Sequence, residues 1–244
     1  MKISIIIPTY NCGQYLKKAI ESVLNQPYEN KELIVIDGGS NDETIKILKS
    51  YGEKIKWLSE KDNGQADAIN KGFKVATGEI IAWLNADDYY EPNVFEIIIS
   101  KFIKDKEVVL VYGNCNSVSK DKVKINIPPQ KMTVRKMINE GNFIYQPASF
   151  YRTQTMKNVD FIDDKLEYLM EYDLFIKLLK TGSSVYINKT LANFVIREDQ
   201  KSNSKNMVSM DNELFRISKK YGGSYFSKVF FRKIYNKIFN IIKK

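Results

Sequence analysis

The segment from Ile80 to Pro92 constrains the fold of this chain more than any other, because an apolar run ends there in two adjacent aspartates, Asp87 and Asp88. Such a run is typical of a strand covered on both faces, and Pro92 indicates that a helix begins soon after it. In open α/β sheets, ligands bind at the carboxyl ends of strands. Adjacent carboxylates repel each other, so a cation or hydrogen-bond donors would complement them. A helix cap would account for one aspartate but not for both.

Strands and helices alternate through the first ninety residues. This alternation predicts a parallel, doubly wound sheet whose strands are continuously apolar because helices cover both faces. The expected strands are Ile3–Pro8, Leu33–Ile36, Ile55–Leu58 and Ile80–Leu84, and the helices between them are Tyr15–Leu24, Glu43–Ser50 and Ala66–Ala76.

Three of these strands end in polar clusters. The clusters are Thr9–Asn11, Asp37–Asp42 and the pair Asp87 and Asp88. Parallel strands bring their carboxyl ends to one edge of the sheet, so we expect the three clusters to meet there. This convergence predicts a binding site on physical grounds alone.

The second part of the chain is less regular. A helix over 92–104 and a strand over Val108–Tyr112 precede the segment Gly113–Asn142, which we expect to cover the site and to vary with the acceptor. Strand character returns over Gln146–Arg152, and an amphipathic helix spans Tyr168–Leu179. Two further short strands are expected over 185–187 and 191–196.

The composition excludes several kinds of site. A chain of 244 residues with 43% hydrophobic and 27% charged residues is typical of a globular protein with one substantial core. Cys12 and Cys115 cannot build a disulfide framework, which favours a reducing cytoplasm. Because the chain has no histidine, a Ser-His-Asp triad and a histidine-bound zinc are excluded. Neither a signal peptide nor a transmembrane stretch is expected.

The positive charge is concentrated at the C-terminal end. From Lys205 onward ten basic residues face two acids, which accounts for +8 of the net charge of +9. The nearly neutral body argues against a nucleic-acid groove. From Tyr225 onward, apolar residues at helical spacing alternate with lysines and arginines. This pattern fits an amphipathic helix on an anionic membrane surface at the inner face of the cell membrane, and equally a helix packed on the body.

Four motifs in this order and spacing resemble those of family 2 glycosyltransferases with the A-type nucleotide-sugar fold. The resemblance covers about residues 1–202. The motifs are Ile5-Ile6-Ile7-Pro8-Thr9-Tyr10-Asn11, then Val35 to Asp42, then Asp62 to Gly72, and finally Trp83 to Asp88.

The resemblance implies where a nucleotide sugar binds. Asp37 would accept a hydrogen bond from a uracil-like imide, and Asp62 with the Gly64 turn would approach the base and ribose. Asp87 would lie near the ribose and the metal, and Asp88 would ligate Mn²⁺ or Mg²⁺ directly. The complete set of implied nucleotide-binding residues is Pro8, Thr9, Tyr10, Asn11, Asp37, Gly39, Asp62, Gly64, Asp67, Asp87 and Arg197.

The resemblance also implies a general base that takes the proton of the acceptor hydroxyl. The matching segment runs from Leu169 to Leu174, where the family often has Glu-Asp-Tyr-Asp-Leu. Met170 stands where that pattern has its first acid, and Glu171 stands where it has its second acid, which is the usual base. Glu171 and Asp88 are therefore the implied catalytic residues. Asp173 would project to another side of the helix, about 200° away, where it caps or braces.

Arg197 is a second departure from the family pattern, because many members have a histidine near this position. Arginine cannot ligate a metal but binds phosphate well. We therefore expect Arg197 to contact the diphosphate, and we expect fewer protein ligands to the metal.

Together these features predict an α/β fold with a single Rossmann-like, A-type domain, a mixed and mostly parallel central sheet, and a helical C-terminal tail. The expected boundaries are 1–112 for the nucleotide-sugar half, 113–202 for the acceptor half and 203–244 for the tail. The expected activity is inverting, metal-dependent transfer of a hexose from a UDP-sugar to a glycan or lipid-linked hydroxyl, in cell-surface polysaccharide synthesis.

Two alternatives remain open. A non-catalytic nucleotide-sugar-binding protein would retain Asp37 but show no turnover, and Asp87, Asp88 and Glu171 count against it. A nucleotidyltransferase would carry a glycine-rich phosphate loop after the first strand, whereas this chain has Thr9 to Gly13 there.

Overall fold

A computed structural model describes residues 1–197 and 206–242, with side chains through residue 236. Its strands are β1 (Ile3–Thr9), β2 (Lys31–Asp37), β3 (Lys56–Ser59), β4 (Ile80–Trp83), β5 (Tyr89–Tyr90), β6 (Val108–Val118), β7 (Val123–Asn126), β8 (Ser149–Arg152) and β9 (Ser183–Val195). Its α-helices are α1 (Gly13–Leu24), α2 (Thr44–Ser50), α3 (Gln65–Val75), α4 (Phe95–Lys104), α5 (Val134–Glu140), α6 (Thr153–Asn158), α7 (Met170–Leu179), α8 (Met207–Lys220) and α9 (Lys228–Ile242). Two short 3-10 helices, η1 (Gly52–Lys54) and η2 (Gln146–Ala148), complete the described elements.

One central sheet has the strand order β3-β2-β1-β4-β8-β6-β9-β5, with β7 paired to β6. The parallel half is confirmed, since β3, β2, β1 and β4 all run the same way. The direction changes where Ile80 of β4 pairs with Arg152 of β8 in antiparallel register. Beyond that point only the pair β6 and β9 is parallel among the described strands, so the mixed sheet is parallel in its first half and largely antiparallel in its second.

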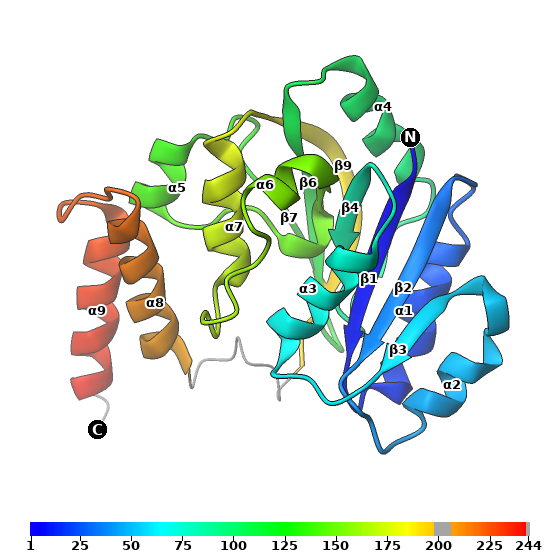
Figure 1. Cartoon of the computed structure of the whole chain (residues 1–244). Coiled ribbons are helices and arrows are strands. Elements are labelled where there is room, and N and C mark those ends of the chain that lie inside the picture. The colour runs from blue at the N-terminus through cyan, green and yellow to red at the C-terminus, as the bar shows by residue number, and fades with distance from the viewer. Residues whose placement is uncertain (198–205, 243–244) are drawn as a thin grey trace.

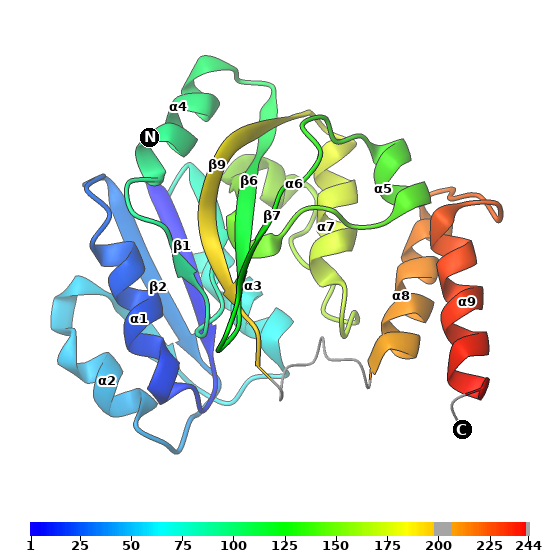
Figure 2. The same cartoon turned by 180° about the vertical axis from the view of Figure 1, so that it is seen from behind.

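Helices cover both faces of the sheet. Figure 1 shows α3, α6 and α7 in front of it, and Figure 2 shows α1, α2 and α4 on the opposite face. On β1, the Ile6 side chain joins the core beneath α3, whereas Ile5 and Ile7 join the core beneath α1. This two-sided burial is the reason that the strands are continuously apolar in sequence.

The second half of the chain departs from the expected boundaries. The strand expected over Val108–Tyr112 continues to Val118, and the two short strands expected after 185 are the single strand β9. The short strand β5 and the helix α6 were not expected at all. For the strands, pairing within the sheet decides the structure, and such pairing is not visible in local periodicity.

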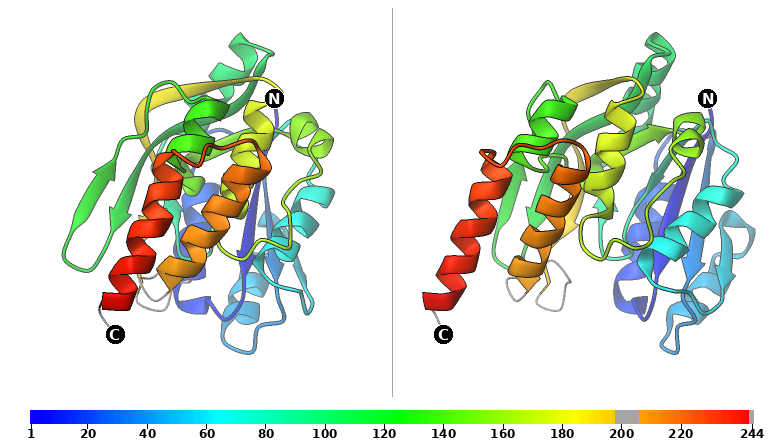
Figure 3. Two further views of the ribbon diagram at one scale, coloured as in Figure 1. Left: turned by 90° about the vertical axis from the view of Figure 1, so that its left-hand side faces the viewer. Right: turned by 60° about the vertical axis from the view of Figure 1, so that its left-hand side comes forward.

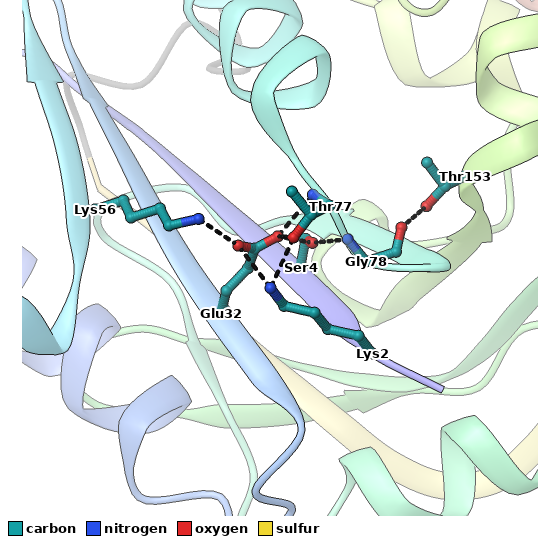
Figure 4. A network of polar contacts seen from close by, with 7 residues as sticks. All are labelled: Lys2, Ser4, Glu32, Lys56, Thr77, Gly78 and Thr153. Atoms are coloured by element: carbon teal, nitrogen blue, oxygen red, sulfur yellow. Dashed lines mark hydrogen bonds and ion pairs between the residues drawn. The ribbon is translucent and has the colours of Figure 1, made fainter.

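A polar network joins the amino ends of the parallel strands, opposite to their carboxyl ends (Figure 4). The buried Glu32 carboxylate accepts hydrogen bonds from Ser4 Oγ (2.6 Å), Thr77 N (2.7 Å) and Thr77 Oγ1 (2.8 Å). Lys2 and Lys56 pair with it at 3.0 and 2.9 Å. Although burial acts to raise it, these hydrogen bonds hold the pKa of Glu32 well below its usual range.

The two C-terminal helices form an antiparallel pair at the end of the molecule far from α2 (Figures 1 and 3). Leu214 and Ile217 of α8 are buried in the core shared with α7, and Val229 of α9 joins them. In the described part of the chain, no helix is both long and apolar enough to cross a membrane.

Candidate active site

A cavity of about 660 Å³ opens at the carboxyl ends of β1 and β4, where the polar clusters were expected to converge. Its lining comes from both halves of the chain. The residues are Pro8, Thr9, Tyr10, Cys12, Asp62, Gly64, Gln65, Ala68, Trp83, Asn85, Ala86, Asp87, Asn142, Phe143, Ile144, Tyr145, Gln146, Pro147, Glu167, Tyr168, Leu169, Met170, Glu171, Phe194, Arg197 and Met210.

The loop after β1 forms the wall of the cavity on the side of the parallel strands. Pro8, Thr9 and Tyr10 line it, as expected. The Thr9 hydroxyl is buried and makes no hydrogen bond within the described residues, so it can serve a ligand. Asn11 lies outside the lining, where its Oδ1 accepts from Asn41 N at 2.9 Å and its own N–H donates to Ser40 Oγ at 2.7 Å. Asn11 therefore joins the loop after β1 to the loop after β2.

Asp37 ends β2 and is fully buried, outside the cavity lining. Its Oδ2 accepts from Gly39 N (3.1 Å), Ser40 N (3.0 Å) and Ser59 Oγ (2.7 Å), and its Oδ1 accepts from Ser40 Oγ. Gly39 has φ +84°, in the left-handed region that favours glycine. In this structure Asp37 organises the loop behind the cavity, and its expected contact with a base remains a prediction.

The turn before α3 contributes Asp62 and Gly64 to the cavity, and their contact with a base and ribose remains a prediction. Asp62 Oδ1 accepts from Gly64 N at 2.9 Å, and Gly64 has φ +109°. Asp67 does not line the cavity. Its carboxylate accepts from Asn63 N at 3.0 Å and pairs with Lys71 at 3.3 Å, which serves the start of α3.

The two aspartates after β4 have different surroundings. Asp87 lines the cavity, whereas Asp88 is 1% exposed and does not. Asp88 Oδ1 accepts from Val195 N at 2.9 Å, and its Oδ2 accepts from Asn85 Nδ2 at 3.2 Å. Burial, followed by the charge of Asp87, raises the pKa of Asp88 well above its usual value. The structure thus presents Asp87 to a ligand and uses Asp88 to connect the strand end to β9.

Arg197 lies beside Asp87 at the cavity wall. Its Nε is 3.1 Å from Asp87 Oδ2, and its guanidinium carbon lies 4.7 Å from the centre of the Tyr15 ring. The ion pair and the contact with the Tyr15 ring hold the guanidinium at the cavity wall. A diphosphate bound beside Asp87 would lie within its reach.

Glu171 lies in the first turn of α7 and lines the cavity. Burial, with a smaller contribution from the charge of Glu213, raises the pKa of Glu171 to about 7. Asp173 projects elsewhere, as expected. It is fully buried and contacts Lys220 Nζ (3.0 Å), Lys177 Nζ (3.1 Å) and Tyr221 Oη (2.9 Å), so it braces α7 against α8.

Several lining residues were not anticipated from the sequence. Of the segment Gly113–Asn142, which was expected to cover the site, only Asn142 lines the cavity, so that expectation is corrected in favour of 142–147. Gln146 is fixed there by its hydrogen bond to Trp83 O at 2.7 Å. Met210 of α8 also lines the cavity. The only local signal for 142–147 is Pro147, whereas Met210 is brought in by helix packing that no motif encodes.

The carboxylates present fit a divalent cation in one specific way. No group of three or more His, Cys, Asp or Glu side chains gathers among the residues that the structure describes. Mg²⁺ and Mn²⁺ are, however, commonly held by one or two carboxylates together with substrate phosphates and water. Asp87 is such a carboxylate at the cavity wall, so the residues present fit a cation that arrives with a diphosphate.

The family model described as Glycosyl transferase family 2 matches residues 4–159. This range runs from β1 to β8 and contains the carboxylates after β4. The chain belongs to this family. This family 2 chain is 32% identical over 219 residues to an uncharacterized glycosyltransferase of Rickettsia typhi, with 83% of this chain and 66% of the relative covered. It is 30% identical over 226 residues to a hyaluronan synthase of Pasteurella multocida, with 88% of this chain covered. The chain spans 66% and 22% of the lengths of these two relatives.

Solved structures establish the A-type fold for this family 2 chain. A TarS fragment of S. aureus in complex with UDP-GlcNAc has a TM-score of 0.73 and 18% identity, covering 98% of this chain and 73% of the fragment. The mannosyltransferase PcManGT of Pyrobaculum calidifontis, in complex with GDP-Man and Mn²⁺, has a TM-score of 0.67 and 14% identity, covering 98% and 70%. The fold expected from the four motifs is therefore confirmed.

Proposed function

We propose that this chain transfers a sugar from a nucleoside diphosphate donor to an acceptor hydroxyl, with inversion at the anomeric carbon. One observation carries the proposal: Asp87, Arg197 and Glu171 line a single cavity, with groups for a diphosphate and a carboxylate for an acceptor in the same space. A non-catalytic binder would not need Glu171 there.

The donor is held on the side of β1 and α3. Thr9, Tyr10, Asp62 and Gly64 surround the space for the nucleoside. A TarS structure contains UDP-GlcNAc and another contains UDP, which supports a uridine donor, whereas PcManGT contains GDP-Man. We propose a UDP-linked hexose as the donor.

Asp87 would hold Mn²⁺ or Mg²⁺, and the buried Asp88, next to it in the chain, would support Asp87. When bound, the ion would supply Lewis-acid stabilisation of the departing diphosphate. Arg197 supplies a fixed positive charge to the same phosphates and pairs with Asp87 in their absence. This assignment transfers the direct role from Asp88, expected from the motif, to Asp87, which is the carboxylate at the cavity.

Glu171 accepts the proton of the acceptor hydroxyl as its oxygen attacks the anomeric carbon. A general base is most effective when its pKa lies near the working pH, and the pKa of Glu171 is raised to about 7. The segments 142–147 and 167–170 form the rest of the acceptor side. The similarity to a hyaluronan synthase and to a chondroitin synthase of Pasteurella multocida supports a glycan or lipid-linked acceptor in cell-surface polysaccharide synthesis.

The exposed face of the C-terminal helix pair supports a membrane partner. Phe226, Phe231 and Tyr235 are 87%, 55% and 66% exposed. Lys228 and Arg232 are also exposed, and they pair with Glu140 and Asp211. Val229 is buried against α8, so α9 packs on the body with one face and leaves this second face outward. We propose that the outward face binds an anionic membrane surface at the cytoplasmic side.

A two-stage experiment tests the proposed function. Thermal shifts with UDP- and GDP-sugars, with and without Mn²⁺, identify the donor, because a ligand of the native state raises its apparent stability. Release of nucleoside diphosphate is then followed with glycan and lipid-linked acceptors, using Glu171→Gln as the control. A donor that stabilises the chain but is never turned over would support the non-catalytic alternative.

A further inference from the structure

Glu213 of α8 contacts the segment that leads into α7. Its Oε1 accepts from Glu167 N at 3.0 Å, and its Oε2 accepts from Tyr168 N at 2.8 Å and from Leu169 N at 2.9 Å. The side chain is buried, and Arg216 approaches it at 3.4 Å from the same helix. A single carboxylate from the C-terminal helices thus satisfies three consecutive backbone donors.

Three successive N–H groups that point at one centre form a concavity suited to an anion. Here the protein supplies the anion itself. Leu169 precedes the first turn of α7, where backbone N–H groups lack partners within the helix. The bound segment also lines the cavity through Glu167, Tyr168 and Leu169. The position of Glu213 therefore sets the path of the backbone along the acceptor side.

Glu171 is two residues beyond this contact. With Leu169 held, the start of α7 is held, and so is the direction in which Glu171 leaves the helix toward the cavity. The charged and titratable groups that act on Glu171 are Glu213 from α8 and Tyr151 from β8. Glu213 is thus related to Glu171 in two ways: through the backbone that it fixes and through its charge.

We propose that Glu213 is a positioning residue for sugar transfer, whose three hydrogen bonds fix residues 167–169 and thereby hold Glu171 and the acceptor wall in place. This inference rests on the proposed function. This role makes α8 part of the active site. α8 lies outside residues 4–159, the range that the family model matches.

A second buried acid on the same helix provides a matched control. Asp211 is also buried, but it pairs with Arg232 at 2.7 Å and with Asn236, both on α9. Asp211→Asn therefore weakens the contact between α8 and α9, whereas Glu213→Gln weakens the contact between α8 and the active site. The two substitutions remove the same charge at positions two residues apart on one helix.

The test uses the full-length chain with its identified donor and acceptor. Glu213→Gln should lower kcat by about 10- to 100-fold, as expected for a small displacement of a reacting group, and should leave donor affinity unchanged. Removing a negative charge near Glu171 lowers its pKa, so the acid limb of the kcat profile should move to lower pH. Glu213→Asp should lower kcat without moving that limb, because it keeps the charge but shortens the arm. Asp211→Asn should change neither quantity.

Amide hydrogen exchange at 167–169 separates this inference from the proposed function. Glu213→Gln should accelerate exchange at these three amides, and Asp211→Asn should not. Normal kcat and an unmoved acid limb in Glu213→Gln would overturn the positioning role, as would unchanged exchange. If the wild-type chain transfers no sugar while the exchange still responds, the proposed function fails and Glu213 is a structural clamp only.

Discussion

Asp87 and Arg197 form an ion pair at the cavity wall, with Arg197 Nε 3.1 Å from Asp87 Oδ2. The pair places a carboxylate suited to a cation next to a cation suited to a phosphate. A bound metal–diphosphate complex would place its cation beside Asp87 and its phosphates beside Arg197. Each residue would then exchange its partner in the ion pair for a partner of the same charge. The proposed donor site is therefore electrostatically paired before a donor binds.

Asp87→Asn should remove the Mn²⁺-dependent part of donor binding and reduce transfer by about 10²-fold or more, because a preorganised electrostatic contact to the leaving group is lost. Thermal shifts with the donor, with and without Mn²⁺, measure the first effect.

Asp88→Asn should instead lower stability by about 1–3 kcal/mol, since an amide nitrogen would face Val195 N or Asn85 Nδ2. Mn²⁺-dependent binding that survives in Asp87→Asn but not in Asp88→Asn would restore Asp88 as the direct ligand.

Arg197→Ala should raise the apparent donor KM by about 10- to 100-fold, the range for a lost hydrogen bond to a charged group. Arg197→Lys should recover only part of this, because lysine keeps the charge but not the planar fork. Arg135→Ala, at an exposed arginine of α5 outside the cavity lining, is the control and should leave KM unchanged. A donor-bound structure with Arg197 directed away from the diphosphate would refute the role.

Glu171→Gln should lower kcat by about 10²–10⁴-fold and preserve donor binding, because the amide keeps the shape but cannot accept the proton. In the wild-type chain kcat should rise with pH through about 7, where Glu171 becomes deprotonated. Single-turnover rates across this range check both points. If Asp173→Asn is folded and inactive while Glu171→Gln transfers sugar normally, the base is Asp173 and not Glu171.

Glu32→Gln should lower the free energy of unfolding by about 1–3 kcal/mol, because an uncharged amide cannot satisfy the donors of Lys2, Ser4 and Thr77 together. The folded-state pKa of Glu32 lies below its ordinary value, so its contribution is complete above the unfolded-state pKa and is lost as the pH falls. Urea unfolding at several pH values measures this. Glu29→Gln, at an exposed acid of the same region, should change stability by less than about 0.5 kcal/mol. Equal losses in both variants would contradict the prediction.

Substitution of Phe226 and Phe231 by serine should weaken binding to vesicles of anionic lipid, and added salt should weaken the binding of the wild-type chain because exposed charges are screened. Co-sedimentation measures both effects. Ile103→Ser is the control, because Ile103 is comparably exposed on α4, away from the C-terminal helices. Equal sedimentation of all three proteins, or binding that does not respond to salt, would exclude the proposed membrane surface.

Local pattern predicted the parallel half of the sheet well, and the largely antiparallel half poorly. β1, β2 and β4 contain continuous apolar runs, and helices separate the strands along the chain, so these strands could be identified from their own residues. The edge strand β3 is partly exposed, and its alternation with the helices indicated it. β5 has two residues and exists only through pairing with Asn193 and Ala192 of β9. No local propensity encodes that pairing.

The sequence by itself indicated the A-type fold, the family and the candidate carboxylates Asp87, Asp88 and Glu171, because the order of the motifs and the periodicity of the strands can be read along the chain. Only the tertiary structure decided that Asp87 and not Asp88 lines the cavity, and that Asp37 organises a loop behind it. It also brought Glu213 to Leu169, 44 residues away. The physical reason is that the direction of a side chain and the partner of a buried charge depend on residues distant in sequence, which meet only when the core has packed.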